Sequence, residues 1–174
     1  MTDSAGAVAV PRDQDRPMAE IAREVILRMT SRGMTLASCE SITGGGIGWV
    51  LTGIPGSSAV YRGGLITYAT ALKCSLAGVD AHYVAQHGVI NEETARQMAA
   101  GARRVCSADV GVATTGTAGP EGQDGVAPGS VWICVETQGG AEAFHLQLHG
   151  GREAIRNAVT RYALDAVLRN LGEG

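Results

Sequence analysis

The chain has 174 residues, a length that fits a single domain able to bury a real core. Hydrophobic residues make up 45% and charged residues 18%, with 25 glycines, which is typical of a compact α/β protein with many tight turns. The formal net charge of -3 argues against a nucleic-acid partner, and no apolar run approaches the ~20 residues of a membrane span, so a soluble protein is expected.

The start of the chain and the cysteines point to the cytoplasm. Residues 1–16 show no periodicity and lack the apolar core of a signal peptide, so a disordered tail is expected there and the folded domain at 17–172. The four cysteines lie far apart, without the close pairs of a zinc site. Reduced and mostly buried thiols are therefore expected, in a cytoplasmic protein.

The first half of the chain predicts alternating helices and strands. Apolar residues recur at helical spacing after Pro17, and Gly33 follows the end of the pattern. Short apolar runs bounded by glycine and proline indicate strands joined by tight turns. The expected elements are an amphipathic helix over 17–29, a strand over 35–39, a helix over 45–51, an extended segment over 59–68 and a short helix over 70–76.

The second half continues this alternation and closes with a hairpin. Asn91, followed by two glutamates, is a good helix start. A β-rich run over 109–115 leads into a glycine-rich loop, and 130–136 and 143–148 are expected to pair as an antiparallel hairpin before a final helix over 151–171. Together these elements predict a single-domain, three-layer α/β/α sandwich with a mixed β-sheet.

One stretch, Leu36 to Gly46, combines an apolar run with polar residues and then three glycines. A strand needs the apolar residues and a tight turn needs glycine, but neither explains Glu40, Ser41 and Thr43 between them. If a helix starts after this turn, Ser41 lies at the carboxyl end of a strand, beside N–H groups that no helical carbonyl uses. Open α/β sheets bind ligands there, although a plain strand-to-helix turn would show the same spacing.

Two further features accompany this stretch. Lys73 is the only lysine among fourteen basic residues, and lysine, unlike arginine, can lose its proton in a protein. The expected short helix would present Lys73 at the same corner as Tyr68. The glycine-rich loop over 116–120, with 121–129 after it, is a second candidate site loop.

The common motifs for nucleotides, hydrolases and metals are missing from the sequence. The glycines before Trp49 form neither the dinucleotide fingerprint nor a Walker loop with its lysine. The nucleophile elbow fails because Cys39 and Thr43 stand where it needs glycine. The four histidines offer no helical metal pair, and only His145 and His149 could share a strand face, so neither a metal nor a cofactor is expected.

The segment Cys39 to Gly45, Cys-Glu-Ser-Ile-Thr-Gly-Gly, closely resembles the Ala-Glu-Ser-x-Thr-Gly-Gly motif of the nicotinamide-nucleotide amidohydrolases, the CinA C-terminal domain family. The resemblance extends over about Met18 to Leu171. Other matching segments follow in the family's order: Ile54 to Ala59, Gly63-Gly64 with Thr67-Tyr68, Lys73 before Leu76 to Val79, His87 to Ile90, Thr115 to Pro120, and Gly151-Arg152.

This resemblance implies a function and a site. It implies metal-free hydrolysis of the carboxamide of nicotinamide mononucleotide to nicotinate mononucleotide and ammonia, in pyridine nucleotide recycling, by a protein that forms homo-oligomers. The catalytic residues would be Ser41, Tyr68 and Lys73: a desolvated lysine takes the serine proton, and the tyrosine relays it or holds the lysine. Backbone N–H groups over 43–45 would stabilise the oxyanion. The residues assigned to substrate binding are Glu40, Thr43, Gly44, Gly45, Ser58, Thr117, Gly119 and Arg152.

The sequence also departs from the family's pattern. Where the family commonly reads Tyr-Ser-Asn-Glu-Ala-Lys, this chain reads Tyr-Ala-Thr-Ala-Leu-Lys over 68–73, so an asparagine amide and a carboxylate are missing beside the expected base. Cys39 replaces a usual alanine, and 124–129 lacks the common lysine. The alternative hypothesis is therefore a catalytically impaired nucleotide-binding or interaction protein with the same fold.

Overall fold

The computed structural model describes residues 16–172, and 1–15 of the expected tail lie outside this range. The described chain forms a mixed five-stranded sheet in the order β2-β1-β3-β4-β5. The strands are β1 (Leu36–Glu40), β2 (Tyr61–Ile66), β3 (Val110–Gly116), β4 (Ser130–Thr137) and β5 (Gly140–Gln147). The first three run parallel, and β4 and β5 continue the sheet as an antiparallel hairpin.

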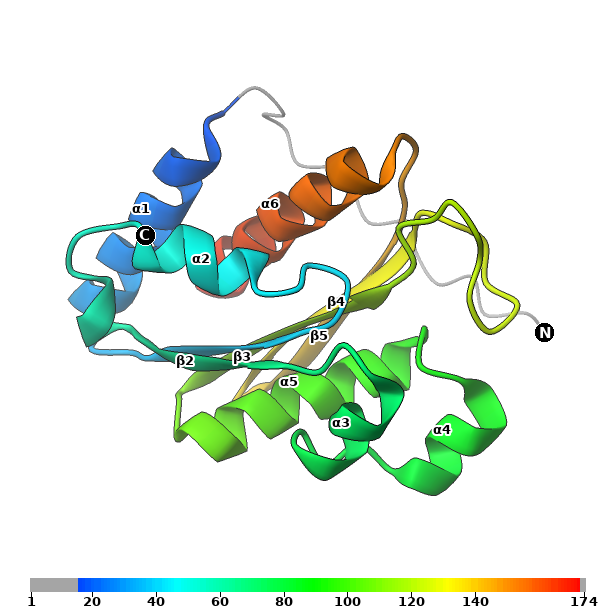
Figure 1. Ribbon diagram of the computed structural model, residues 1–174. Helices are drawn as coiled ribbons and strands as arrows, with labels where there is room; N and C mark the ends of the chain where they lie inside the picture. Colours follow the sequence, from blue (N-terminus) through cyan, green and yellow to red (C-terminus); the bar gives the residue numbers. More distant parts are fainter. Residues whose placement is uncertain (1–15, 173–174) are drawn as a thin grey trace.

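Helices cover both faces of the sheet (Figure 1). One face carries α1 (Met18–Ser31), α2 (Gly46–Thr52) and α6 (Arg152–Asn170), and the other carries α3 (Thr70–Ser75), α4 (Ala81–His87) and α5 (Glu92–Cys106). A 3-10 turn, η1 (Ser57–Ala59), precedes β2. This arrangement confirms the predicted three-layer α/β/α sandwich. Within residues 16–172, no helix is both long and apolar enough to cross a membrane.

Two hydrophobic cores, one on each face, hold the layers together. The larger core packs Leu36 of β1 and its neighbours against α1, α2 and α6, where Leu164 is fully buried. The smaller core, under α5, uses small side chains such as Ala37 and Ala99. Gly111 of β3 permits this close approach, because a Cβ there would lie 2.1 Å from the carbonyl oxygen of Ala99. With β2 and β3 on either side, β1 is enclosed, and all five of its residues are buried.

The structure differs from the sequence prediction in two elements. Helix α4 was not predicted; Asp80 caps its first turn by accepting hydrogen bonds from the N–H groups of His82 and Tyr83. Strand β5 begins at Gly140, three residues earlier than expected, because Thr137 and Gly140 already pair across the hairpin turn. The predicted start of α5 is confirmed, since the Asn91 side chain accepts a hydrogen bond from the N–H of Thr94.

Candidate active site

Ser41 and Lys73 meet at the carboxyl end of β1. Ser41 follows the strand directly, and its N–H donates to the carbonyl oxygen of Thr114 in β3 at 3.1 Å. The neighbouring strand β2 ends beside Glu40, and α3 then returns Lys73 to this corner. The Nζ of Lys73 donates to Ser41 Oγ at 3.0 Å and to the carbonyl oxygen of Thr67 at 2.7 Å. The predicted proximity of these two side chains, 32 positions apart, is therefore present in the fold.

Lys73 lies in surroundings that favour its neutral form. Its side chain is 1% exposed, and among residues 16–172 it has no salt-bridge partner. Burial is the main cause that lowers the pKa of the Lys73 amine, because desolvation penalises the charged form. Burial also raises the pKa of the adjacent Cys39 thiol to about 11, so this cysteine stays protonated near neutral pH. The corner thus holds a hydroxyl beside an amine that can accept its proton.

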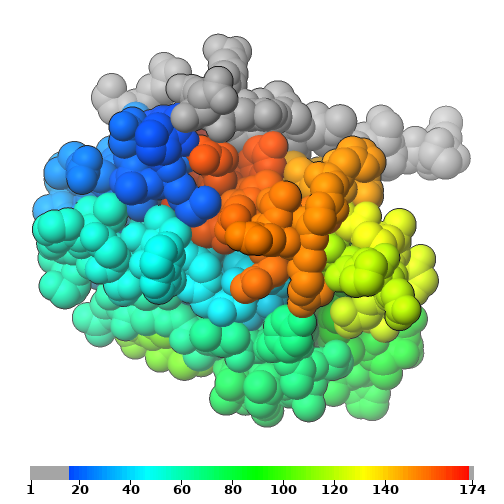
Figure 2. Space-filling view, turned by 45° about the horizontal axis from the view of Figure 1, so that its top comes forward, coloured from blue at the N-terminus to red at the C-terminus, as the bar shows by residue number. Residues whose placement is uncertain are grey.

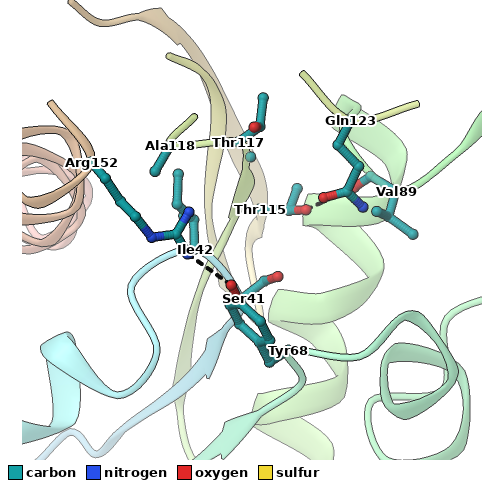
Figure 3. Close-up of a pocket in the computed structure, with 10 residues that line it drawn as sticks. Ser41, Ile42, Tyr68, Val89, Thr115, Thr117, Ala118, Gln123 and Arg152 are labelled. Atoms are coloured by element: carbon teal, nitrogen blue, oxygen red, sulfur yellow. Dashed lines mark hydrogen bonds between the residues drawn. The ribbon is translucent and has the colours of Figure 1, made fainter. Parts of the chain in front are cut away.

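A small cavity opens in front of Ser41 (Figure 3). Its volume is about 110 Å³, well below the ~300–1,000 Å³ of common ligand pockets, so it can enclose only one small portion of a ligand. The loop after β3, the second candidate site loop of the sequence, contributes Thr117, Ala118 and Gln123 to the lining of the same cavity. The lining residues are Ser41, Ile42, Tyr68, Val89, Thr115, Gly116, Thr117, Ala118, Gln123 and Arg152.

Tyr68 and Arg152 form the rim of this cavity. Arg152 donates one hydrogen bond to the Tyr68 hydroxyl at 2.8 Å and another to the carbonyl oxygen of Gly119 at 2.9 Å, and Figure 3 shows the first of these contacts. The Tyr68 side chain is 62% exposed. The expected role of Tyr68 in holding the lysine is filled by the Thr67 carbonyl instead, and Tyr68 lies where it can contact a bound ligand.

Glu40, to which the family resemblance gave a role in substrate binding, forms its hydrogen bonds with the turn that follows it. The residue is 1% exposed, and its carboxylate accepts five hydrogen bonds. Two come from the hydroxyls of Ser38 and Thr43 at 3.1 and 2.7 Å. The other three come from backbone N–H groups at the start of α2, those of Gly45, Ile47 and Gly48, each at 3.0 Å. The carboxylate thus caps the helix, which has no side-chain cap at Gly45.

Two of the three backbone N–H groups over 43–45, the expected oxyanion donors, are paired within the turn. The N–H of Gly44 donates to the carbonyl oxygen of Ser41 at 3.2 Å, and that of Gly45 is taken by Glu40. The Thr43 hydroxyl donates to Glu40 and lies 2.9 Å from the Thr114 hydroxyl. These groups shape the turn and are not available to a ligand, whereas the N–H of Thr43 has no acceptor within residues 16–172.

The other predicted binding residues divide into two groups. Thr117 lines the cavity, and its hydroxyl donates to the carbonyl oxygen of Glu121 at 3.2 Å. Gly119 contributes the carbonyl that holds Arg152. Ser58 is exposed in η1, before the amino end of β2, whereas the site lies at the carboxyl ends of the parallel strands. The structure therefore does not bring Ser58 to the cavity.

Sequence reasoning missed three contributors to the site. The carbonyl of Thr67 anchors Lys73, and Gln123 lines the cavity from the second loop. Arg156, one helical turn after Arg152, donates to the carbonyl oxygens of Ile42 and Thr43. The spacing of four residues between Arg152 and Arg156 could have indicated this contact, because residues four apart lie on the same face of a helix. Within the part of the chain that the structure describes, no three His, Cys, Asp or Glu side chains gather as a metal site.

Comparison with known proteins places this chain in a family. The model of the CinA C-terminal domain matches residues 18–171. A CinA-like protein of Frankia casuarinae is 42% identical over 143 residues, covering 82% of this chain and 33% of the relative. One of Gemmatimonas aurantiaca is 40% identical over 151 residues, covering 86% and 35%. The chain thus spans about a third of the length of these relatives.

Solved structures of similar proteins share the whole fold. The competence/damage inducible protein CihA from Agrobacterium tumefaciens has a TM-score of 0.85 at 34% identity, covering 95% of this chain and 99% of that protein. The competence damage-inducible protein A from Klebsiella pneumoniae has a TM-score of 0.88 at 30% identity, with 91% and 99% covered. The two structures therefore match the described domain from end to end.

Proposed function

Because the chain belongs to the CinA C-terminal domain family, we propose that it is an amidase that converts nicotinamide mononucleotide to nicotinate mononucleotide and ammonia. The observation that supports catalysis most directly is the buried Lys73 amine 3.0 Å from Ser41 Oγ. The choice of substrate follows from the motif around Ser41, which resembles that of the nicotinamide-nucleotide amidohydrolases. Such an enzyme would act in the cytoplasm, in the recycling of pyridine nucleotides.

The reaction would begin with proton transfer from Ser41 to Lys73. A neutral amine keeps an N–H for the Thr67 carbonyl while its lone pair accepts the serine proton. Ser41 Oγ then attacks the carboxamide carbon, and the C–N bond breaks as Lys73 returns the proton to the departing nitrogen, which leaves as ammonia. Water hydrolyses the resulting ester by the same acid–base exchange, giving the carboxylate and free serine.

The size of the cavity fits only one end of such a substrate. At about 110 Å³ it would enclose the carboxamide and part of the ring, and the ribose and phosphate would extend past the rim formed by Tyr68 and Arg152. The guanidinium of Arg152 is held by Gly119 and Tyr68 at this rim, where it can pair with an anionic group. We therefore assign carboxamide chemistry to the cavity and phosphate recognition to its rim.

Ammonia release from nicotinamide mononucleotide by the purified chain tests this proposal. Turnover that disappears in Ser41→Ala supports it, and the absence of ammonia from the folded wild-type protein contradicts it. The alternative, a nucleotide-binding protein without turnover, is favoured by the changed residues at the start of α3, where Ala69 gives the helix no side-chain cap. Calorimetric binding of the nucleotide without ammonia release would establish that alternative.

A further inference from the structure

Two backbone N–H groups directly after Ser41 have no acceptor within residues 16–172. They are those of Ile42 and Thr43, and these two residues, backbone included, are 4% and 2% exposed. The next three N–H groups, from Gly44 to Gly46, are all paired. A buried N–H without an acceptor is rare in folded proteins, and it calls for an explanation such as a bound oxygen atom. Ile42 also lines the cavity that contains Ser41.

The guanidinium of Arg156 binds two carbonyl oxygens of the same turn. Arg156 of α6 donates from Nε to the carbonyl oxygen of Ile42 at 3.1 Å and from Nη2 to that of Thr43 at 3.0 Å. In Figure 2 the orange start of α6 lies against the cyan segment that contains this turn. This contact is close, because a Cβ on Gly44 would lie 3.2 Å from Nη2 of Arg156. Arg156 therefore fixes the turn from the side of α6.

Both unpaired N–H groups are linked to this guanidinium through peptide bonds. The carbonyl of Ile42 and the N–H of Thr43 belong to one peptide group, so a cation on the oxygen makes that N–H a stronger donor. The second link passes through two peptide groups. Arg156 donates to the carbonyl oxygen of the peptide between Thr43 and Gly44, and the N–H of this peptide donates to the Ser41 carbonyl oxygen. The Ser41 carbonyl belongs to the next peptide group in this chain, whose N–H is that of Ile42. Hydrogen bonds in such chains strengthen one another.

We propose that Arg156 is the positioning residue of an oxyanion site formed by the N–H groups of Ile42 and Thr43. The inference rests on the proposed role of Ser41 as nucleophile. When Ser41 Oγ attacks a carbonyl, negative charge develops on the carbonyl oxygen, and donors held in place beforehand stabilise it without reorganisation. Arg156 holds and polarises these donors without touching the substrate.

An ester probe tests this role independently of the natural substrate. With 4-nitrophenyl acetate, Ser41 Oγ forms a bond to the acetyl carbon, its proton passes to Lys73, and the ester bond breaks to release 4-nitrophenolate. Since loss of one oxyanion donor typically costs ~10²–10³ in rate, Arg156→Gln should slow acetylation of Ser41 by about 10- to 100-fold. Arg169→Gln is the matched control, because Arg169 lies on the same helix but stacks over Phe144.

Several readouts separate this role from a structural one. Arg156→Gln should lower the rate at every pH without moving the pH profile, since Lys73 is unchanged, and added guanidinium should restore part of the rate in Arg156→Ala. Acetylation of Arg156→Gln at the wild-type rate would overturn the proposal. If Arg156→Gln does not fold, Arg156→Lys provides the test. Its single cationic group should give an acetylation rate between those of the wild type and a variant without the cation, and a wild-type rate would overturn the proposal.

The same experiment distinguishes this inference from the proposed function. Wild-type protein that is acetylated at Ser41, detected by mass spectrometry, but that releases no ammonia from nicotinamide mononucleotide contradicts the amidase proposal alone. Wild-type protein that is not acetylated overturns the oxyanion site, because an activated serine beside two preorganised donors should react with an active ester.

Discussion

Replacing Glu40 by glutamine tests whether this carboxylate supports the turn or binds substrate. The substitution keeps the size of the side chain but exchanges one acceptor oxygen for an NH₂ group. In the wild type, one oxygen accepts from Ser38 and from the N–H of Gly48, and the other accepts from Thr43 and from the N–H groups of Gly45 and Ile47. An amide can satisfy only one of these two sets.

The expected loss of stability follows from this count. If the amide oxygen stays with Thr43 and the first turn of α2, the N–H of Gly48 faces an NH₂ group, and an unsatisfied buried donor costs about 1–3 kcal/mol. The remaining bonds change from charged to neutral acceptors, each weakened by roughly 1 kcal/mol. Because these contributions are not fully additive, we expect the free energy of unfolding to fall by about 3–5 kcal/mol.

Urea unfolding followed by tryptophan fluorescence measures this change, since Trp49 lies in α2. Glu153→Gln is the matched control: it makes the same exchange in the first turn of α6, where Glu153 is exposed, and should change stability by less than about 0.5 kcal/mol. The reasoning is refuted if Glu40→Gln matches this control in stability but raises KM, because Glu40 would then contact the substrate and not the turn.

Four further predictions concern the chemistry. Ser41→Ala should fold and bind the nucleotide but release no ammonia, which calorimetry and an ammonia assay check together; a variant that keeps most of the rate would move the nucleophile elsewhere. Lys73→Arg and Lys73→Met should both lose ~10²–10⁴ in kcat, because neither can accept a proton near neutral pH, and wild-type kcat in the arginine variant would show that Lys73 acts as a fixed cation. Wild-type kcat/KM should rise with pH through the pKa of Lys73, which burial lowers below the ordinary ~10.4. The free energy of unfolding should also rise with pH between this lowered pKa and ~10.4, because in that range the unfolded chain binds one more proton than the folded chain. Lys73→Met should abolish that rise in stability. Dialysis against EDTA should leave turnover intact, since no cluster of metal ligands exists within 16–172, and restoration of lost activity by zinc would contradict the serine mechanism.

Local patterns in the sequence were enough to predict the layers, whereas the family resemblance implied the pairing of Ser41 with Lys73. The helical spacing after Pro17, the buried run before Glu40 and the cap at Asn91 each act within a few residues, so periodicity reveals them. Ser41 and Lys73 come together because β1 and β2 are adjacent and parallel, so the segments that follow their carboxyl ends meet at one edge of the sheet.

The roles of individual polar atoms could not be predicted in the same way. Glu40 occupies the last position of a fully buried strand, so its carboxylate had to find internal donors, but the sequence does not say that those donors are the N–H groups of α2. Arg156 is 114 positions from the Ile42 carbonyl that it binds, and only the packing of α6 brings them together. Ser58 matched a family segment, yet the fold places it at the other end of β2.

Glu40 directly precedes Ser41, yet its buried carboxylate pairs with the turn and α2, while Ser41 contacts the Lys73 amine. A carboxylate paired with Lys73 would stabilise the ammonium form and raise the pKa of the amine. The Glu40 carboxylate is instead surrounded by five donors from the turn and α2, and it is not among the groups that raise the pKa of Lys73. The Glu40 carboxylate therefore stabilises the turn, and burial is the main cause of the lowered pKa of Lys73.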